Sequence, residues 1–131
     1  MSEEKKRTVL IVEDEGLLRE LMAEKLQIEG FNTLEATDGD EGLEVALKEL
    51  PDLIVLDLLM PKMGGMEVLR KLREDDRGRG IPVIIVSNLS GKENIAEGAG
   101  LGAVEYLIKA NFSLDEIVDK IKEMGKLRMQ W

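Results

Sequence analysis

Four short apolar runs, each rich in β-branched residues and each followed at once by a polar side chain, constrain the fold of this 131-residue chain most strongly. They span residues 9–12, 53–56, 83–86 and 104–108. Runs this short and apolar are typical of strands buried on both faces, as in a parallel sheet. Since ligands of such sheets bind beyond the carboxyl ends of the strands, we expect the side chains that follow the runs to gather at one edge.

The residues after the four runs are Glu13 with Asp14, then Asp57, Ser87 and Lys109. Three carboxylates, a hydroxyl and an ammonium on one edge suit the binding of a divalent cation and a phosphoryl group. We expect Asp14 and Asp57 to bind the cation directly and Glu13 to act through water. The backbone carbonyl of Leu59 would supply a further oxygen.

Each of these residues also has an ordinary structural interpretation. An acidic pair after a strand often caps a helix, a lone Asp often belongs to a turn, and Lys is usually solvated. Crowded like charges are costly unless a cation lies between them, which favours the metal site. Beside a metal, Asp57 becomes a candidate nucleophile that forms an acyl phosphate. Lys109 and Ser87 would then neutralise and hydrogen-bond the phosphoryl oxygens.

The composition narrows the chemistry further. The chain has no Cys and no His, which excludes disulfides, thiolate metal sites and the commonest zinc ligand. A metal must therefore be bound by oxygen, which predicts Mg²⁺, with Mn²⁺ or Ca²⁺ as alternatives. The formal net charge of −9 argues against direct binding to nucleic acid or anionic membranes. With no signal peptide and no run of ~18 apolar residues, we expect a cytoplasmic protein.

Helical spacing of apolar residues appears between the runs. It predicts five helices. The first spans residues 16–29, and its apolar residues are Leu17, Leu18, Leu21, Met22 and Leu26. The second follows a cap at residues 38–41, with apolar residues Leu43, Ala46, Leu47 and Leu50, and the third carries Met66, Leu69 and Leu72. The fourth lies within residues 91–102, with Ile95, Ala96 and Ala99 facing inward. The fifth begins at a capping box of Ser113 and Glu116 and ends at about Met124. Residues 31–36 are expected to form one more strand of mixed composition, the second in chain order. Alternation of strand and helix predicts an α/β fold, a doubly wound five-stranded parallel sheet with helices on both faces.

Three other segments also allow predictions. Gly98 and Gly100 lie inside the fourth helix, each at a cost of about 1 kcal/mol relative to Ala, so the segment of residues 91–102 should be the least stable part of its face of the domain. The tail that ends in Trp131 is expected to dangle. The basic residues near the third helix are expected to form a solvated face: Arg70, Lys71, Arg73, Arg77 and Arg79.

From residue 8 to about residue 124 the chain resembles the receiver domains of bacterial response regulators. The residues that carry the resemblance are Val12-Glu-Asp-Glu15, Leu56-Asp-Leu-Leu-Met-Pro-Lys-Met-Gly-Gly-Met-Glu67, Val86-Ser87, Gly102-Ala-Val-Glu-Tyr106 and Ile108-Lys109. The resemblance implies one receiver domain over residues 1–131, with its core at about 8–124. It also implies a flavodoxin-like sheet with strand order 2-1-3-4-5.

The same resemblance implies a role for each site residue. Asp57 would accept a phosphoryl group from the phosphohistidine of a sensor histidine kinase or phosphotransfer protein, while Glu13 and Asp14 hold Mg²⁺. Lys109 would bridge to the phosphoryl group, and Ser87 with Tyr106 would form a conformational switch. The protein would not be an enzyme, although it takes part in its own phosphorylation and dephosphorylation. Its output would be contact with a downstream protein through the fourth helix, fifth strand and fifth helix, as a monomer or weak homodimer.

Two departures from the family pattern lie near the site. Ala110 follows Lys109 where the family usually has Pro, so we expect a trans bond there, because a non-proline cis bond costs ~2.5–4 kcal/mol. Asn88 follows Ser87 where a smaller residue is usual, and it would narrow access to Asp57 or donate to the phosphoryl group. Leu59 and Leu89 flank the site and would slow hydrolysis of the phosphorylated state.

Three other functions fit the strand and helix pattern less well. A flavin or nucleotide binder needs a Gly- or Ser/Thr-rich phosphate loop after the first strand, whereas this chain has Glu13-Asp-Glu-Gly16. A phosphatase of the haloacid dehalogenase type carries a second Asp two residues after the nucleophile, where this chain has Leu59. A receiver fold that acts as a scaffold without phosphorylation is the third alternative.

Overall fold

A computed structural model describes residues 6–124, so the expectation for Trp131 lies outside the described residues. The elements, in chain order, are β1 (Thr8–Val12), α1 (Gly16–Ile28), β2 (Asn32–Ala36), α2 (Gly39–Glu49), β3 (Leu53–Leu56), α3 (Gly65–Glu74), β4 (Val83–Ser87), α4 (Lys92–Gly100), β5 (Glu105–Ile108), the short 3₁₀ turn η1 (Lys109–Asn111) and α5 (Leu114–Met124). No helix in the described part of the chain is both long and apolar enough to cross a membrane.

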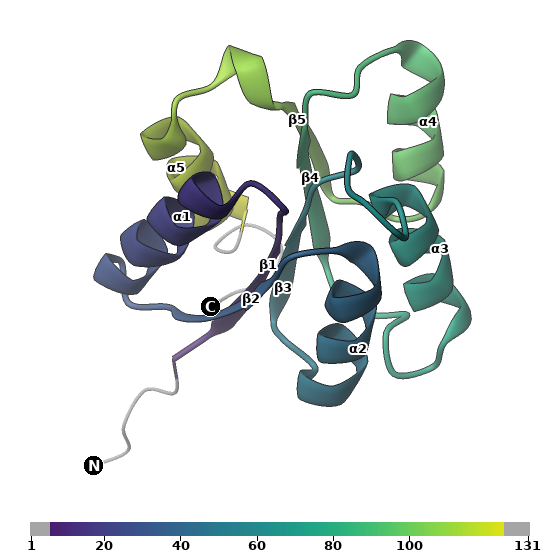
Figure 1. Ribbon diagram of the computed structural model, residues 1–131, viewed down its shortest axis with the longest axis horizontal. Coiled ribbons are helices and arrows are strands. Elements are labelled where there is room, and N and C mark those ends of the chain that lie inside the picture. The colour runs from purple at the N-terminus through teal and green to yellow at the C-terminus, as the bar shows by residue number, and fades with distance from the viewer. Residues whose placement is uncertain (1–5, 125–131) are drawn as a thin grey trace.

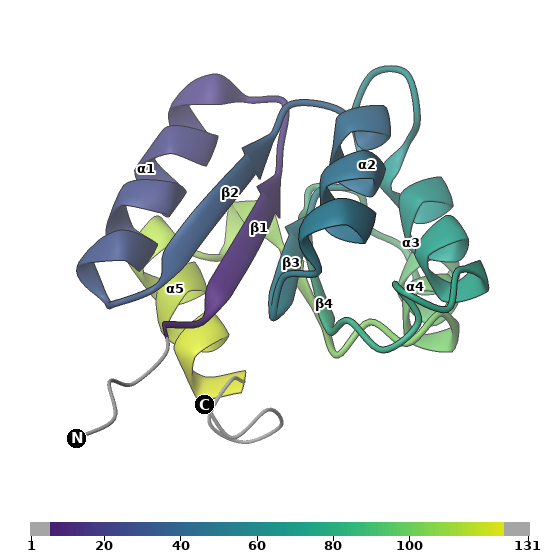
Figure 2. The same cartoon turned by 90° about the horizontal axis from the view of Figure 1, so that it is seen from below.

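The five strands form one parallel sheet in the order β2-β1-β3-β4-β5, as predicted. Helices α1 and α5 cover one face, and α2, α3 and α4 cover the other (Figures 1 and 2). Val12 pairs with both Ala36 and Leu56, so β1, β2 and β3 end at the same level. This register brings the loops that follow the strands to one edge.

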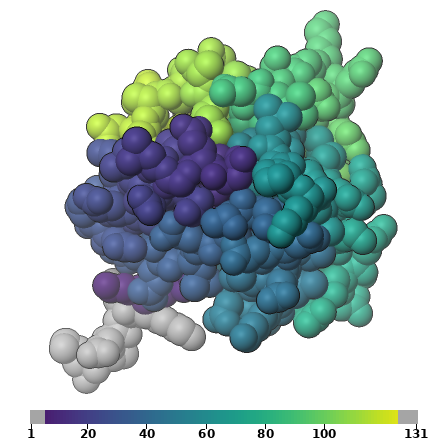
Figure 3. All heavy atoms as spheres, in the orientation of Figure 1, coloured from purple at the N-terminus to yellow at the C-terminus, as the bar shows by residue number. Residues whose placement is uncertain are grey.

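The core has two halves because successive side chains of a strand point to opposite faces. Val9 and Ile11 pack towards α1 and α5, while Leu10 and Val12 pack towards α2 and α3. The space-filling view shows α1 lying against α5 on the same side of the molecule (Figure 3). The strands β1, β3 and β4 are almost wholly buried, as their apolar runs predict.

The two predicted helix starts form as the sequence indicates. At α2, Asp38 Oδ1 accepts from the Glu41 backbone N–H at 2.8 Å. Before α5, Ser113 and Glu116 make a reciprocal capping box, with bonds of 2.8 and 3.1 Å. These caps satisfy backbone groups that the first turn of a helix leaves unpaired.

The predicted apolar stripes of α1 and α2 need correction. Leu17 is 69% exposed and Leu21 is also exposed, whereas Met22 and Leu26 are buried. Successive helical residues lie about 100° apart, so residues one position before the buried stripe turn away from the sheet. Leu50 is not a core residue of α2 either, because it ends the helix in a left-handed conformation (φ 49°) with its side chain exposed.

The predicted inward face of α4 is wrong. Ile95, Ala96 and Ala99 are exposed, and Gly98 is the buried residue of the helix. A Cβ atom at Gly98 would lie 2.8 Å from Ile85 Cδ1 and 3.4 Å from the Tyr106 ring. The glycine therefore lets α4 approach the sheet closely, which a pattern of apolar residues does not reveal.

Arg73 on α3 is the exception in the predicted basic face. Arg70, Lys71, Arg77 and Arg79 are exposed as expected. The half-buried guanidinium of Arg73 instead donates to carbonyl oxygens of the two loops beside it. Its acceptors are Gly78 (3.0 Å), Arg79 (3.1 Å), Ile81 (2.9 Å), Leu101 (2.7 Å) and Gly102 (3.4 Å).

Candidate functional site

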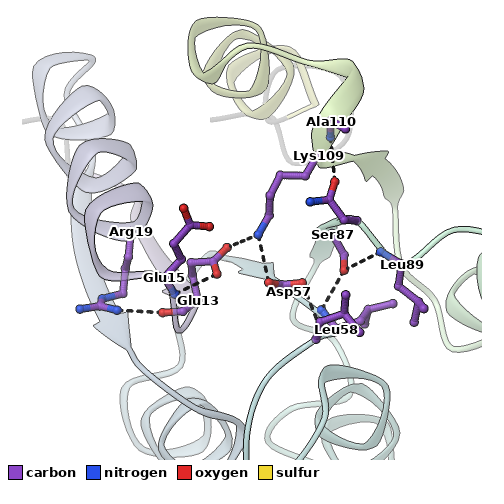
Figure 4. Close-up of polar contacts among 11 residues, drawn as sticks. Glu13, Glu15, Arg19, Asp57, Leu58, Ser87, Leu89, Lys109 and Ala110 are labelled. Carbon is purple, nitrogen blue, oxygen red and sulfur yellow. Dashed lines mark hydrogen bonds and ion pairs between the residues drawn. The ribbon is translucent and has the colours of Figure 1, made fainter.

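Glu13, Asp57 and Lys109 meet at the carboxyl edge of the sheet (Figure 4). The Asp14 carboxylate lies beside those of Glu13 and Asp57. One carboxylate oxygen from each of the three acidic residues lies within 4.8 Å of the others. Lys109 Nζ donates to Glu13 Oε1 at 2.7 Å and to Asp57 Oδ2 at 3.0 Å. The structure thus brings together residues that lie as far as 96 positions apart in the chain.

Glu13 is only 3% exposed and is held on several sides. Its Oε2 accepts from the Glu15 backbone N–H at 3.1 Å, and its own backbone N–H donates to the Ala36 carbonyl at 3.0 Å. Burial raises the pKa of the Glu13 carboxyl, and the hydrogen bonds from Lys109 and Glu15 offset this shift in part. The site therefore holds a buried carboxylate whose charge is incompletely compensated.

Arg19, on α1, holds the same loop and was missed by the sequence analysis. Its Nη1 donates to the Glu13 carbonyl oxygen at 2.9 Å (Figure 4). Its Nε pairs with Glu35 Oε1 at 3.1 Å. The contact fixes the backbone from which Glu13 projects. The sequence pattern does not identify this contact, because its acceptor is a backbone carbonyl, which every residue carries, and the second partner, Glu35, lies on β2.

Asp57 is 4% exposed, and each of its carboxylate oxygens has a partner. Oδ1 accepts from the Leu59 backbone N–H at 3.1 Å, and Oδ2 accepts from Lys109. Gly65 allows α3 to begin against this strand end, since a Cβ there would lie 2.1 Å from the Asp57 carbonyl oxygen. The carboxylate is thus oriented by two donors from different loops.

Lys109 reaches both carboxylates although Ala110 follows it, in place of the proline that the resemblance implies. Burial lowers the pKa of Lys109, but the hydrogen bonds and charges of Glu13 and Asp57 outweigh burial, so the pKa is raised overall. No cis peptide bond occurs in residues 6–124, which confirms the trans bond predicted before Ala110. The ammonium is therefore charged at neutral pH.

Ser87 and Tyr106 both bind the loop that follows β4. Ser87 is fully buried, and its Oγ accepts from the backbone N–H groups of Leu58 (3.4 Å) and Leu89 (3.2 Å). Neither bond uses its hydroxyl hydrogen. The Tyr106 hydroxyl donates to the Leu89 carbonyl oxygen at 2.5 Å, and its pKa is raised by burial and by the charge of Asp57.

The donor set fits a divalent cation that prefers oxygen. Three carboxylates face a single ammonium group, so the cluster has an excess of negative charge even with Lys109 in place. A hard cation such as Mg²⁺ or Mn²⁺ is bound by such oxygen ligands and would neutralise the excess. Asp14, which is exposed, would be the first of the three to meet an ion from solvent.

Apolar side chains flank the site as expected. Leu59 is 52% exposed and Leu89 is half-buried. Both lie in loops that bear hydrogen bonds to Asp57 or Ser87. Their effect on an attacking water molecule stays a prediction.

The sequence model of the response regulator receiver domain matches residues 9–122. Sporulation initiation phosphotransferase F of Bacillus subtilis is 36% identical over 120 residues, which cover 92% of this chain and 94% of that protein. The probable transcriptional regulatory protein TcrX of Mycobacterium tuberculosis is 35% identical over 117 residues, which cover 89% of this chain and 49% of that protein.

Among solved structures, the chemotaxis protein CheY4 of Vibrio cholerae superimposes with a TM-score of 0.82 at 28% identity, covering 91% of this chain and 98% of that chain. The chain spans about half the length of several transcriptional regulators that it matches. It spans nearly the whole of the sporulation protein and of CheY4. The shared region is therefore the same unit in all of these relatives.

Proposed function

This chain belongs to the response regulator receiver domain family, and from that premise we propose that Asp57 accepts a phosphoryl group in a Mg²⁺-dependent reaction. The observation that carries the proposal is the pairing of the buried Asp57 carboxylate with Lys109 at 3.0 Å, within reach of the Glu13 and Asp14 carboxylates. Phosphoryl transfer needs a fixed nucleophile and positive charge around the moving phosphoryl oxygens. Both requirements have candidate residues here.

In the proposed reaction, an Asp57 carboxylate oxygen attacks the phosphorus of a donor phosphohistidine. The O–P bond forms as the N–P bond breaks, and the imidazole nitrogen keeps the electron pair and takes a proton from solvent. The Leu59 backbone N–H orients the carboxylate, while Lys109 shifts its contact towards the incoming phosphoryl oxygens. A histidine kinase or a phosphotransfer protein would supply the phosphohistidine.

Glu13, Asp14 and Asp57, with the Leu59 carbonyl oxygen, would hold Mg²⁺, and Mn²⁺ would serve in its place. When bound, the ion supplies positive charge for the phosphoryl oxygens. Glu13 is prepared for such a role by the Glu15 N–H and by Arg19, which fixes its backbone. An orienting outer contact of this kind is typical of metal sites in proteins.

The signal would leave the site through Ser87 and Tyr106. Turning the Ser87 hydroxyl to the phosphoryl group would disturb its bonds to Leu58 and Leu89, and Tyr106 is bonded to Leu89 as well. The face formed by α4, β5 and α5 would change with them and bind a downstream protein. We place this activity in the cytoplasm, in a monomer or weak homodimer without direct contact to nucleic acid.

The test is phosphorylation by acetyl phosphate with and without Mg²⁺, followed by intact mass. We expect a gain of one phosphoryl group that requires Mg²⁺ and vanishes in Asp57→Asn. Asp76→Asn is the matched control, since the Asp76 side chain is 89% exposed on a distant loop. A wild-type protein that gains no mass would point to a scaffold that acts without phosphorylation. A gain that persists in Asp57→Asn would exclude Asp57 as the acceptor.

A further inference from the structure

A hydrogen bond joins the loops that follow β4 and β5, one residue away from the site on each side. Asn88 Oδ1 accepts from the backbone N–H of Ala110 at 2.9 Å, and Figure 4 shows Ala110 beside Lys109. Because a backbone N–H can only donate, the oxygen of the Asn88 amide must face Ala110. The contact therefore has one defined orientation.

Both partners are departures from the family pattern noted in the sequence. Proline has no backbone N–H, so a chain with proline in place of Ala110 could not form this bond. A smaller residue in place of Asn88 would lack an acceptor that reaches across the gap. The two departures are thus the two partners of one hydrogen bond, in which Ala110 supplies the donor and Asn88 the acceptor.

The bond adds a third connection between residues 87–89 and the loops around them. Ser87 binds the Leu58 N–H beyond β3, Asn88 binds the loop that starts with Lys109, and the Leu89 carbonyl binds Tyr106. Movement of Ser87 would accordingly be passed through Asn88 to the residue next to Lys109. The bond is exposed, so water competes for it, and the experiments below measure whether it persists.

We propose that Asn88 is a positioning residue, which holds Lys109 over Asp57 and Glu13 and couples its placement to that of Ser87. The proposal rests on the proposed phosphoacceptor function for its consequence, but its geometric part does not. Lys109 is the first residue of η1, so a restraint on Ala110 limits the directions in which the Lys109 side chain can leave the backbone. Asn88 acts on the reaction only through Lys109.

The first experiment compares Asn88→Ala with Asn111→Ala, which removes the same kind of side chain from the other side of Ala110. Asn111 is exposed, as is Asn88, so both variants should fold. In Asn88→Ala we expect faster amide exchange of the Ala110 N–H, a changed chemical shift of the Lys109 ε-CH₂ group, and phosphorylation by acetyl phosphate that is about two- to tenfold slower. Asn111→Ala should match the wild type in all three measurements.

A double-mutant cycle with Ala110→Pro separates the hydrogen bond from other effects of the Asn88 side chain. The proline removes the donor, and although its ring also restricts Lys109, that effect is present in both members of the pair and cancels. Asn88→Ala should therefore slow phosphorylation in the wild-type background but leave the rate nearly unchanged in the Ala110→Pro background. Equal slowing in both backgrounds would overturn the proposal.

The measurements keep the two proposals distinguishable. If the wild type is not phosphorylated, the phosphoacceptor function fails, while the Ala110 exchange rate and the Lys109 shift still decide whether Asn88 positions the lysine. If the wild type is phosphorylated and Asn88→Ala behaves like Asn111→Ala, Asn88 has no positioning role and the function stands. An unchanged Lys109 shift in Asn88→Ala overturns the positioning role in either case.

Discussion

Replacing Arg73 by methionine should destabilise the fold far more than its position on a basic helix face suggests. The guanidinium donates to five carbonyl oxygens from the loops on either side of it. Leu101 and Gly102 follow α4, whose last turn has no basic residue of its own. Arg73 therefore satisfies carbonyl groups at the end of α4 and fastens this end to α3.

The size of the destabilisation follows from the hydrogen bonds of Arg73 that are least accessible to water. The bonds to Gly78, Ile81 and Leu101 are partly buried, whereas those to Arg79 and Gly102 are exposed. Counting about 1 kcal/mol for each of the partly buried bonds gives a loss of about 3 kcal/mol. For a domain of this size, that loss lowers the melting temperature by roughly 10 °C. Methionine keeps the aliphatic stem, so little of the loss comes from packing.

Urea unfolding followed by circular dichroism measures the difference, with Arg70→Met as the matched control. Arg70 lies one turn earlier on α3 and makes an exposed ion pair with Glu97 at 2.7 Å, so its loss should cost less than about 1 kcal/mol. Arg73→Lys keeps the positive charge but loses the planar set of guanidinium donors, so its free energy of unfolding should lie between those of the wild type and Arg73→Met. Equal stabilities of Arg70→Met and Arg73→Met would refute the reasoning that Arg73 holds these loops.

Three further predictions concern α4, Tyr106 and the lysine of the site. Gly98→Ala should destabilise by about 1–3 kcal/mol in urea unfolding, because its Cβ would clash with Ile85, whereas Gly100→Ala, with nothing within 4 Å, should not destabilise. Tyr106, the chain's one tyrosine, should ionise above pH 10 in an absorbance titration, and Asp57→Asn should lower its pKa. Because the folded state favours the neutral phenol, the free energy of unfolding should fall as the pH rises beyond about 10. Lys109→Met should lower the free energy of unfolding by about 3 kcal/mol without Mg²⁺, since it leaves Glu13 and Asp57 buried without the lysine ammonium. Added Mg²⁺ should restore part of this stability in thermal unfolding. A Lys109→Met protein as stable as wild type would show that the two carboxylates do not need the ammonium.

The sheet could be predicted because its information is local. A strand buried on both faces has to be apolar along its whole length, and residues 53–56 and 83–86 satisfy this without a break. The parallel register then aligns the carboxyl ends, so Asp57 and Lys109 belong to the same edge of the sheet, and the strand order that the resemblance implies brings them close together.

The helix faces were less predictable because they depend on partners in other elements of the fold. Gly98 counts as a weakness in a helix taken alone, yet it is the residue that lets α4 contact Ile85 and Tyr106. Arg73 looks like any solvated basic residue until the loops that it binds are folded around it. Arg19 likewise acquires its role only when β2 brings Glu35 beside it. In each case the decisive contact comes from outside the helix that carries the residue.

The roles of Asn88 and Ala110, next to the site, likewise depend on a contact between two loops. Taken singly, Ala110 removes a conformational restraint on the loop of Lys109, and Asn88 adds bulk next to Ser87. Together they form a hydrogen bond that neither residue implies alone. A residue near an active group is therefore best judged together with the residue that it contacts, because the Ala110 N–H, which a proline would lack, finds its acceptor on the neighbouring loop.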